Sequence, residues 1–339
     1  MLSAERRTVT NPAMSAPIDE TSPVRPADSL PTTHRLYCGD ARQLGWLETE
    51  SFHLVVTSPP YWTLKEYNEA EGQLGAIAEY DNFMAELDRV WAECARALVP
   101  GGRIVCVVGD VCLSRRKNKG RHSVIPLHAD IAIRCRRLGL DYLTPILWHK
   151  IANASYEVEN GSSFLGKPYE PNAIIKNDIE YVLMLRKPGG YRKPTEEQRR
   201  LSKLSREEHG AWFRSFWADV PGASTRDHPA PYPVELAYRL VRMFSFAGDT
   251  VLDPFAGTFS TTIAAIEAGR SSIAVELDPV YFADGVRRVN RAAARLDLFG
   301  GPIAVEVSCQ FPSAGSQEQE TACSQTKQAV SWRSARSPC

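Results

Sequence analysis

The stretch Val251-Leu252-Asp253-Pro254-Phe255-Ala256-Gly257-Thr258-Phe259-Ser260-Thr261-Thr262 joins a short apolar run to a segment with helical character. Gly257 permits a tight turn, and the Ser and Thr residues behind it can cap a new helix. A second short run, Ser272-Ile273-Ala274-Val275, then ends at Glu276-Leu277-Asp278. A strand, a loop, a helix and a second strand in this order predict a βαβ unit with parallel strands.

This unit has the features of a nucleoside site. An acidic residue at the end of the second strand, here Glu276, can accept hydrogen bonds from both ribose hydroxyls. The loop has a single glycine and not the Gly-x-Gly-x-x-Gly pattern of dinucleotide sites. A nucleoside without a phosphate, such as S-adenosylmethionine, therefore fits better. The alternative is a plain strand–turn–helix corner of an α/β fold.

Strands and helices alternate along the rest of the chain. Strands are expected at residues 36–38, 53–56, 103–108, 143–148, 179–185, 250–253 and 272–275, and helices at 81–98, 125–138, 233–246, 261–268 and 281–296. This alternation predicts a doubly wound, mostly parallel, seven-stranded sheet of the Rossmann type. The domain is expected over residues 34–300. The segments 1–33 and 305–339 have few large apolar residues, which predicts disordered tails.

The composition is typical of a soluble globular protein. The chain has 339 residues, of which 43% are hydrophobic and 24% charged, and no apolar run is long enough for a transmembrane helix. None of the eight cysteines forms a Cys-x-x-Cys pair, which disfavours a zinc site and favours a reducing cytoplasm. The 40 basic and 40 acidic residues balance, so any contact with nucleic acid needs a local basic patch.

A second loop carries the sequence Thr57-Ser58-Pro59-Pro60-Tyr61 and follows the apolar run Leu54-Val55-Val56. Two successive prolines remove two N–H donors and fix φ twice, so the loop is stiff. It presents one hydroxyl, carbonyl oxygens without competing N–H groups, and one aromatic ring. These groups suit a planar base that carries an exocyclic amine.

Together the two loops resemble those of the beta class of DNA amino-methyltransferases. In that class a (Ser/Asn/Asp)-Pro-Pro-(Tyr/Phe) loop precedes the S-adenosylmethionine loop, which is a circularly permuted motif order. The segments 37–41, 98–102 and 228–236 also resemble the family, and the resemblance spans roughly residues 35–295. One departure is Phe259, which stands where the family loop often ends in Gly or Asn.

The resemblance implies S-adenosylmethionine as the cofactor, no metal, and roles for the residues of both loops. Ser58 and the Pro59 carbonyl would each take one N–H of the target amino group, Pro60 would keep the loop rigid, and Tyr61 would stack on a base flipped out of the duplex. Serine at the first position favours cytosine N4, with adenine N6 as the alternative. The expected cofactor-binding residues are Asp40, Asp253, Pro254, Phe255, Gly257, Thr258, Glu276 and Asp278.

Two basic segments lie between the loops, where the beta class has its target-recognition region. One is the loop 114–122, with Arg115, Arg116, Lys117, Lys119 and Arg121, and the other is the insert 186–227, with Arg192, Lys193, Arg199 and Arg200. Contact with DNA phosphates is expected for these side chains. The alternative for any single one is a solvated surface charge.

The sequence therefore predicts a site-specific methyltransferase that acts on duplex DNA, in the cytoplasm at the nucleoid. A non-catalytic DNA-binding relative is a second alternative. A cognate restriction endonuclease, and the choice between a monomer and a homodimer, are left open.

Overall fold

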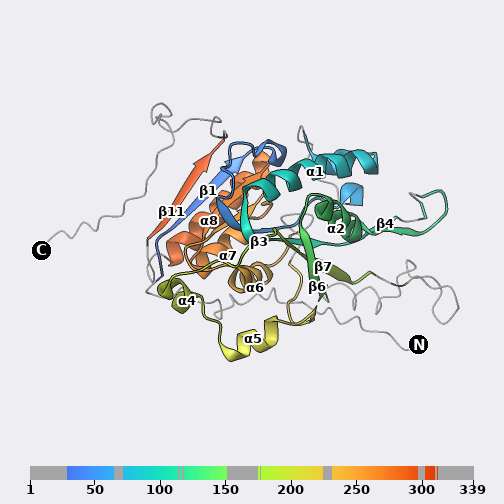
Figure 1. The fold of residues 1–339 in the computed structure, drawn as a ribbon. Helices are drawn as coiled ribbons and strands as arrows, with labels where there is room; N and C mark the ends of the chain where they lie inside the picture. Colours follow the sequence, from blue (N-terminus) through green and yellow to red (C-terminus); the bar gives the residue numbers. More distant parts are fainter. Residues whose placement is uncertain are drawn as a thin grey trace, which may run out of the picture.

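The computed structural model describes residues 29–64, 72–113, 115–116, 118–150, 175, 177–223, 231–296, 302–309 and 311. Within this part of the chain a nine-stranded sheet forms the centre of the molecule (Figure 1). In spatial order its strands are β11 (Ile303–Ser308), β1 (Thr32–Cys38), β10 (Ser271–Glu276), β9 (Thr250–Asp253), β2 (Phe52–Thr57), β3 (Leu98–Val108), β7 (Ile179–Arg186), β6 (Asp141–His149) and β8 (Phe216–Trp217).

The sheet is mostly parallel, as predicted. Parallel pairing runs without interruption from β11 through β1, β10, β9 and β2 to β3. Strand β7 is antiparallel to both β3 and β6, so β6 again runs in the direction of β3. All seven strands expected from the sequence are present, and they are adjacent in the sheet.

Two edge strands, β8 and β11, bring the sheet to nine strands where seven were expected. Strand β11 pairs with β1 because Ile303 and Val305 alternate along it and pack against the core. Beyond it, the ring of Phe311 stacks on that of Trp46 at 5.5 Å. The expected end of the domain at residue 300 and the expected tail from residue 305 are therefore corrected. The amino-terminal boundary also moves, since β1 begins at Thr32.

Helices cover both faces of the sheet, which explains why its central strands are apolar throughout. Val55 and Leu252 face the layer that contains α1 and α2, whereas Leu54 and Val251 face α6 and α7. Helix α8 packs beside α7 on that second face. The helices are α1 (Tyr80–Ala97), α2 (Leu127–Arg137), α6 (Val234–Phe244), α7 (Ser260–Ala268) and α8 (Pro279–Leu296).

Smaller elements lie outside these layers. They are the 3₁₀ turns η1 (Ala41–Gln43), η2 (Trp62–Leu64) and η3 (Leu74–Ala76), the hairpin strands β4 (Val111–Leu113) and β5 (Ser123–Ile125), and the helices α4 (Glu196–Ser202) and α5 (Arg206–Trp212). Capping boxes at Thr195 and Ser205 start the two short helices. None of the helices in the described ranges is both long and apolar enough to span a membrane.

Candidate active site

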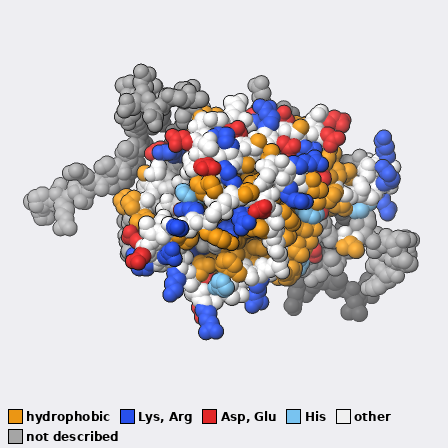
Figure 2. Space-filling model, in the orientation of Figure 1, with side chains coloured by type: hydrophobic (Ala, Val, Ile, Leu, Met, Phe, Trp, Pro, Cys, Tyr) orange, Lys and Arg blue, Asp and Glu red, His pale blue; other side chains and the backbone are white. Residues whose placement is uncertain are grey.

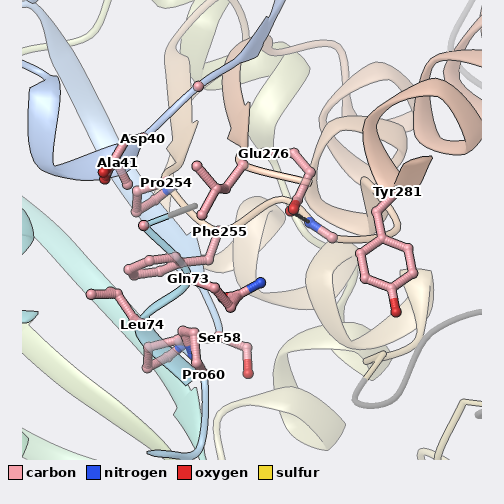
Figure 3. A pocket seen from close by; sticks show the side chains of 15 residues that line it. Asp40, Ala41, Ser58, Pro60, Gln73, Leu74, Pro254, Phe255, Glu276 and Tyr281 are labelled. Carbon is pink, nitrogen blue, oxygen red and sulfur yellow. Dashed lines mark hydrogen bonds between the residues drawn. The ribbon is translucent and has the colours of Figure 1, made fainter. Parts of the chain in front are cut away.

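A cavity lies at the carboxyl edge of four neighbouring strands, β1, β10, β9 and β2. Because these strands are parallel, the loops that follow them meet at one edge of the sheet. Figure 3 shows their side chains around a common space. The lining residues are Gly39, Asp40, Ala41, Ser58, Pro59, Pro60, Gly72, Gln73, Leu74, Pro254, Phe255, Gly257, Glu276, Leu277 and Tyr281.

The Glu276 carboxylate is held in a fixed orientation in this cavity. The N–H of Gly257 donates to Oε2 at 2.7 Å, and the N–H of Asp278 donates to Oε1 at 2.9 Å. Burial raises the pKa of Glu276 to about 7, although both N–H groups favour the charged form. The result is an acceptor held in a fixed orientation at the end of β10.

Asp40 lies on the cavity wall, in the turn after β1, and is also fixed by neighbours. Its carboxylate accepts the N–H of Arg42 at 2.9 Å and caps η1. The Arg42 guanidinium donates to the same carboxylate and to Glu86 of α1 at 2.6 Å. Asp40 is therefore a constrained acceptor on the cavity wall, and Arg42 is the residue that orients it.

The Ser58-Pro59-Pro60 segment lines the cavity, but Tyr61 does not. The Ser58 hydroxyl donates to the Tyr61 hydroxyl at 3.3 Å, and Tyr61 donates to Glu180 Oε2 at 3.2 Å. The Tyr61 ring is 6% exposed and belongs to the core. The Tyr61 ring thus packs among core residues with its hydroxyl at Ser58, and its stacking on a flipped base stays a prediction.

Asp253 and Asp278 do not line the cavity, contrary to expectation. Asp253 turns inward because it accepts the Thr57 hydroxyl at 2.7 Å and the Tyr232 hydroxyl at 3.0 Å, which ties β9 to the end of β2. Asp278 accepts the N–H groups of Val280 and Tyr281 and so caps α8. Both carboxylates are 1% exposed. Asp253 thus links β9 to β2 and Asp278 caps α8, and contact of either with a cofactor stays a prediction.

Thr258 also departs from the prediction. It lines an adjoining hollow that shares Gly257 and Tyr281 with the cavity. Its carbonyl oxygen accepts a hydrogen bond from Arg288 of α8. Of the β9 loop residues, Pro254, Phe255 and Gly257 are the ones that reach the cavity.

The first basic segment is the tip of the β4–β5 hairpin, which leaves the sheet at this same edge. Strand β3 ends at Val108, beside Tyr61, and β4 then contacts η2. Arg115, Arg116, Lys119 and Arg121 are exposed there, and Lys117 lies outside the described residues. Figure 2 shows Lys and Arg side chains over this hairpin, at the right-hand end of the molecule. The hairpin therefore places positive charge at the carboxyl edge of the sheet, the edge at which the cavity lies.

The second basic segment lies beside the amino-terminal ends of the parallel strands, opposite the cavity. Arg192 pairs with Asp249, which precedes β9, and Gln198 of α4 donates to the carbonyl of Ala247. These partners stand at the amino end of β9, whereas the cavity stands at its carboxyl end. Arg192, Lys193, Arg199 and Arg200 are thus removed from the cavity, and their contact with DNA phosphates stays a prediction.

Comparison with known proteins identifies the family. The family model for N6/N4-type DNA methylases matches residues 52–287, a range that includes both loops and most of the sheet. The chain belongs to this DNA methylase family. The methylase is 36% identical over 271 residues to the type II methyltransferase M.MthZI of Methanothermobacter thermautotrophicus, and the match covers 74% of each protein.

Two further relatives show the same extent of similarity. The type II methyltransferase M.MjaI of Methanocaldococcus jannaschii is 37% identical over 281 residues, which cover 74% of this methylase and 88% of the relative. TTHA0409 of Thermus thermophilus, solved in complex with S-adenosyl-L-methionine, is 52% identical. That comparison covers 81% of this methylase and 99% of the other chain, with a TM-score of 0.65.

Several residues of the methylase site were missed by sequence reasoning. Gln73, Leu74 and Tyr281 line the cavity, but no motif marks them. Glu180 had a usable signal, since a carboxylate in a mostly apolar strand is rare without a specific partner. Among the described residues, no cluster of His, Cys, Asp and Glu side chains is arranged to hold a metal ion.

Proposed function

We propose that this methylase transfers a methyl group from S-adenosyl-L-methionine to the exocyclic N4 of cytosine in duplex DNA, at a specific sequence. The observation that carries the proposal is that Ser58, Pro59 and Pro60 line the same cavity as Glu276. A rigid hydroxyl-and-carbonyl loop thus faces the position expected for a nucleoside cofactor. The cavity brings together the two partners of an amino-methyl transfer.

The residues of the cavity fit the cofactor. The fixed Glu276 carboxylate suits a pair of ribose hydroxyls, and Pro254, Phe255 and Leu277 provide apolar surface for an adenine ring. When bound, S-adenosylmethionine supplies a methyl group activated by a sulfonium sulfur. Asp40 offers a second fixed acceptor for polar groups of the cofactor.

The catalytic loop acts on the target nitrogen. An exocyclic amine of a base is a poor nucleophile because its lone pair is delocalised into the ring. Ser58 Oγ and the Pro59 carbonyl would each accept one N–H, which draws the nitrogen toward tetrahedral geometry and frees the lone pair. Pro60 keeps both acceptors in place, since its φ is fixed.

The choice of cytosine rests on Ser58, and adenine N6 is the second candidate. The family resemblance associates serine with N4 and aspartate with N6. The test is to methylate DNA of varied sequence with labelled S-adenosylmethionine, digest it, and identify the labelled nucleoside. N4-methylcytosine is expected. N6-methyladenine would overturn the base assignment, and no label in DNA would overturn the function.

The affinity for S-adenosylmethionine is expected to rise between pH 6 and pH 8. The pKa of Glu276 is raised to about 7, so the carboxyl is largely protonated at pH 6 and ionised at pH 8. The ionised form is the stronger acceptor for ribose hydroxyls, so binding at pH 6 should release a proton. Isothermal titration calorimetry in buffers of different ionisation enthalpy measures both effects.

The control for this prediction is Glu276→Gln, which cannot titrate. It should bind more weakly at pH 8, by about tenfold or more, and lose the Glu276-dependent proton release. Glu306→Gln, at an exposed ion pair with Arg35, should behave as the wild type. An affinity of the wild type that is equal at pH 6 and pH 8 would refute the role given to Glu276.

The hairpin is expected to carry the electrostatic part of DNA binding. The double variant Arg115→Gln/Arg116→Gln should weaken DNA binding and lower the slope of log K against log salt concentration by up to about 2, because each lost phosphate contact removes roughly 0.9. Fluorescence anisotropy at several salt concentrations measures the slope.

A matched control removes two positive charges from the amino-terminal ends of the parallel strands. Lys193 and Arg199 are the residues to change there. The double variant Lys193→Gln/Arg199→Gln should leave the salt slope unchanged, because these side chains lie at the amino end of the strands. Equal losses in the two double variants would show that the hairpin has no special part in binding.

A further inference from the structure

We propose that the Glu180 carboxylate ends a hydrogen-bond chain that fixes the Ser58 hydroxyl as an acceptor and receives the proton released by the target amino group. This inference rests on the proposed function, because it assigns an additional positioning residue to the same reaction. The chain runs from the catalytic loop after β2 to the beginning of β7.

The chain has three members and one counter-ion. Ser58 Oγ donates to the Tyr61 hydroxyl at 3.3 Å, and the Tyr61 hydroxyl donates to Glu180 Oε2 at 3.2 Å. Lys150 Nζ donates to the other oxygen, Oε1, at 2.9 Å. Glu180 is thus linked to the catalytic hydroxyl through Tyr61 and to a cation on its other side.

The chemistry of the groups sets the direction of these bonds. An ionised carboxylate has only acceptor sites, so the Tyr61 hydroxyl must point its proton at Glu180. The Tyr61 oxygen then has lone pairs that accept the proton of Ser58. Ser58 Oγ, having donated its own proton, keeps lone pairs for an N–H of the base. Without Glu180 the two hydroxyls could rotate, and Ser58 would no longer be held as an acceptor.

Burying the Glu180 carboxylate at this position costs free energy, and the surrounding residues offset that cost. Its side chain is 13% exposed in a strand that is mostly apolar, so it needs a charged partner. Lys150 supplies that charge and is held over the ring of Trp148, 5.4 Å from its centroid. Gly222 leaves room for the lysine, because a Cβ there would lie 2.9 Å from Lys150 Cγ. If residue 180 had only a structural role, an apolar side chain would cost less free energy there.

The same hydrogen-bond chain can take up the proton that the reaction releases. As the new N–C bond forms and the methyl–sulfur bond breaks, positive charge moves from sulfur to the amino nitrogen. One proton of that nitrogen passes to Ser58 Oγ, the Ser58 proton passes to the Tyr61 oxygen, and the Tyr61 proton passes to Glu180 Oε2. The methylated base leaves neutral, and the protonated Glu180 returns its proton to solvent.

The test is a double-mutant cycle of Glu180→Gln and Tyr61→Phe, read out as the single-turnover rate of methyl transfer to DNA. Tyr61→Phe removes one oxygen atom and leaves the Glu180–Lys150 pair intact, so it covers the case in which Glu180→Gln does not fold. Each variant should lower the rate by about 10²-fold, the lower end of general acid–base effects. The double variant should be no slower than the slower single variant, because either change breaks the same chain.

Two further measurements separate positioning from a structural role. The dissociation constant for S-adenosylmethionine and the KM for DNA should change by less than about threefold, since the effect is on kcat. The matched controls are Glu306→Gln and Tyr142→Phe, whose side chains are exposed and outside the chain. They should keep the wild-type rate.

The outcomes distinguish this inference from the proposed function. If the wild type is active and each single variant keeps its rate within about threefold of it, the role of Glu180 is overturned and the proposed function still stands. Effects that multiply in the double variant would also overturn it, because the residues would then act independently. Absence of methyl transfer by the wild type would overturn the proposed function and, with it, the role of Glu180.

Discussion

Replacing Ser58 by alanine is expected to lower the rate of methyl transfer by about 10²- to 10³-fold, the loss typical of removing one preorganised hydrogen-bonding group from an active site. Ser58 Oγ is the hydroxyl that the catalytic loop presents to the cavity, held by Tyr61 at 3.3 Å. Alanine leaves an N–H of the target amine without its acceptor. The amine then keeps its lone pair in the ring, where it cannot attack.

The measurement is the single-turnover rate with bound S-adenosylmethionine, together with the affinity for that cofactor. The affinity should be nearly unchanged, because the fixed acceptors Glu276 and Asp40 stay in place. Ser51→Ala provides the control, since Ser51 is exposed and its hydroxyl donates to the carbonyl of Glu48, away from the cavity. A Ser58→Ala variant with the wild-type rate would remove the catalytic loop from the mechanism.

The largest effect on stability is expected at Phe259. This residue is the N-cap of α7 and lies in the left-handed region, with φ 60° and ψ 29°, and its ring is fully buried. The ring packs on Phe282, with centroids 5.9 Å apart, and fills the space above Gly285, where a Cβ would lie 2.0 Å from Phe259 Cδ2. Phe259→Ala should therefore lower the free energy of unfolding by about 3–5 kcal/mol, through the lost burial and the cavity left behind.

Gly285 is expected to be coupled to Phe259. Gly285→Ala alone should be destabilising by about 1–3 kcal/mol, because the new methyl group overlaps the ring. In a Phe259→Gly background the ring is absent, and alanine in α8 gains helix propensity of about 1 kcal/mol over glycine. Gly285→Ala should then be neutral or stabilising, so its effect changes sign between the two backgrounds.

Urea unfolding of the four proteins of this cycle measures the coupling. Gly210→Ala in α5 is the matched control, since a Cβ there meets no atom within 4 Å. It should not destabilise either background. Additive effects of Phe259→Gly and Gly285→Ala would show that the ring and the glycine do not compensate for each other.

Phe259 also illustrates the limit of reading a motif. The sequence shows that an aromatic residue stands where the family loop often has Gly or Asn. It does not show that the Phe259 ring packs against Gly285 on the next helix, where any larger residue would overlap it. Complementarity of this kind depends on which helices are neighbours, and local patterns carry no information about that.

Three carboxylates near the strand ends also differ in a way that their local sequence does not show. Glu276, Asp253 and Asp278 all stand at strand ends or just beyond them, so their sequence contexts are alike. Glu276 faces the cavity, whereas Asp253 turns inward to buried hydroxyls and Asp278 caps α8. Side-chain direction at a strand end is decided by the available donors, and these come from distant parts of the chain.

Local sequence patterns were enough to predict the seven central strands, the parallel sheet and the two loops of the site, because strand–helix alternation and proline or glycine turns are local properties. The folded sheet was needed to see which basic segment lies at the same edge as the cavity. Both are basic, but strand direction places the β4–β5 hairpin at the carboxyl edge and Arg192 at the amino edge. Likewise Glu180 joins the catalytic loop only because β7 begins at the edge where β2 ends. Such pairings follow from the order and direction of strands in the folded sheet.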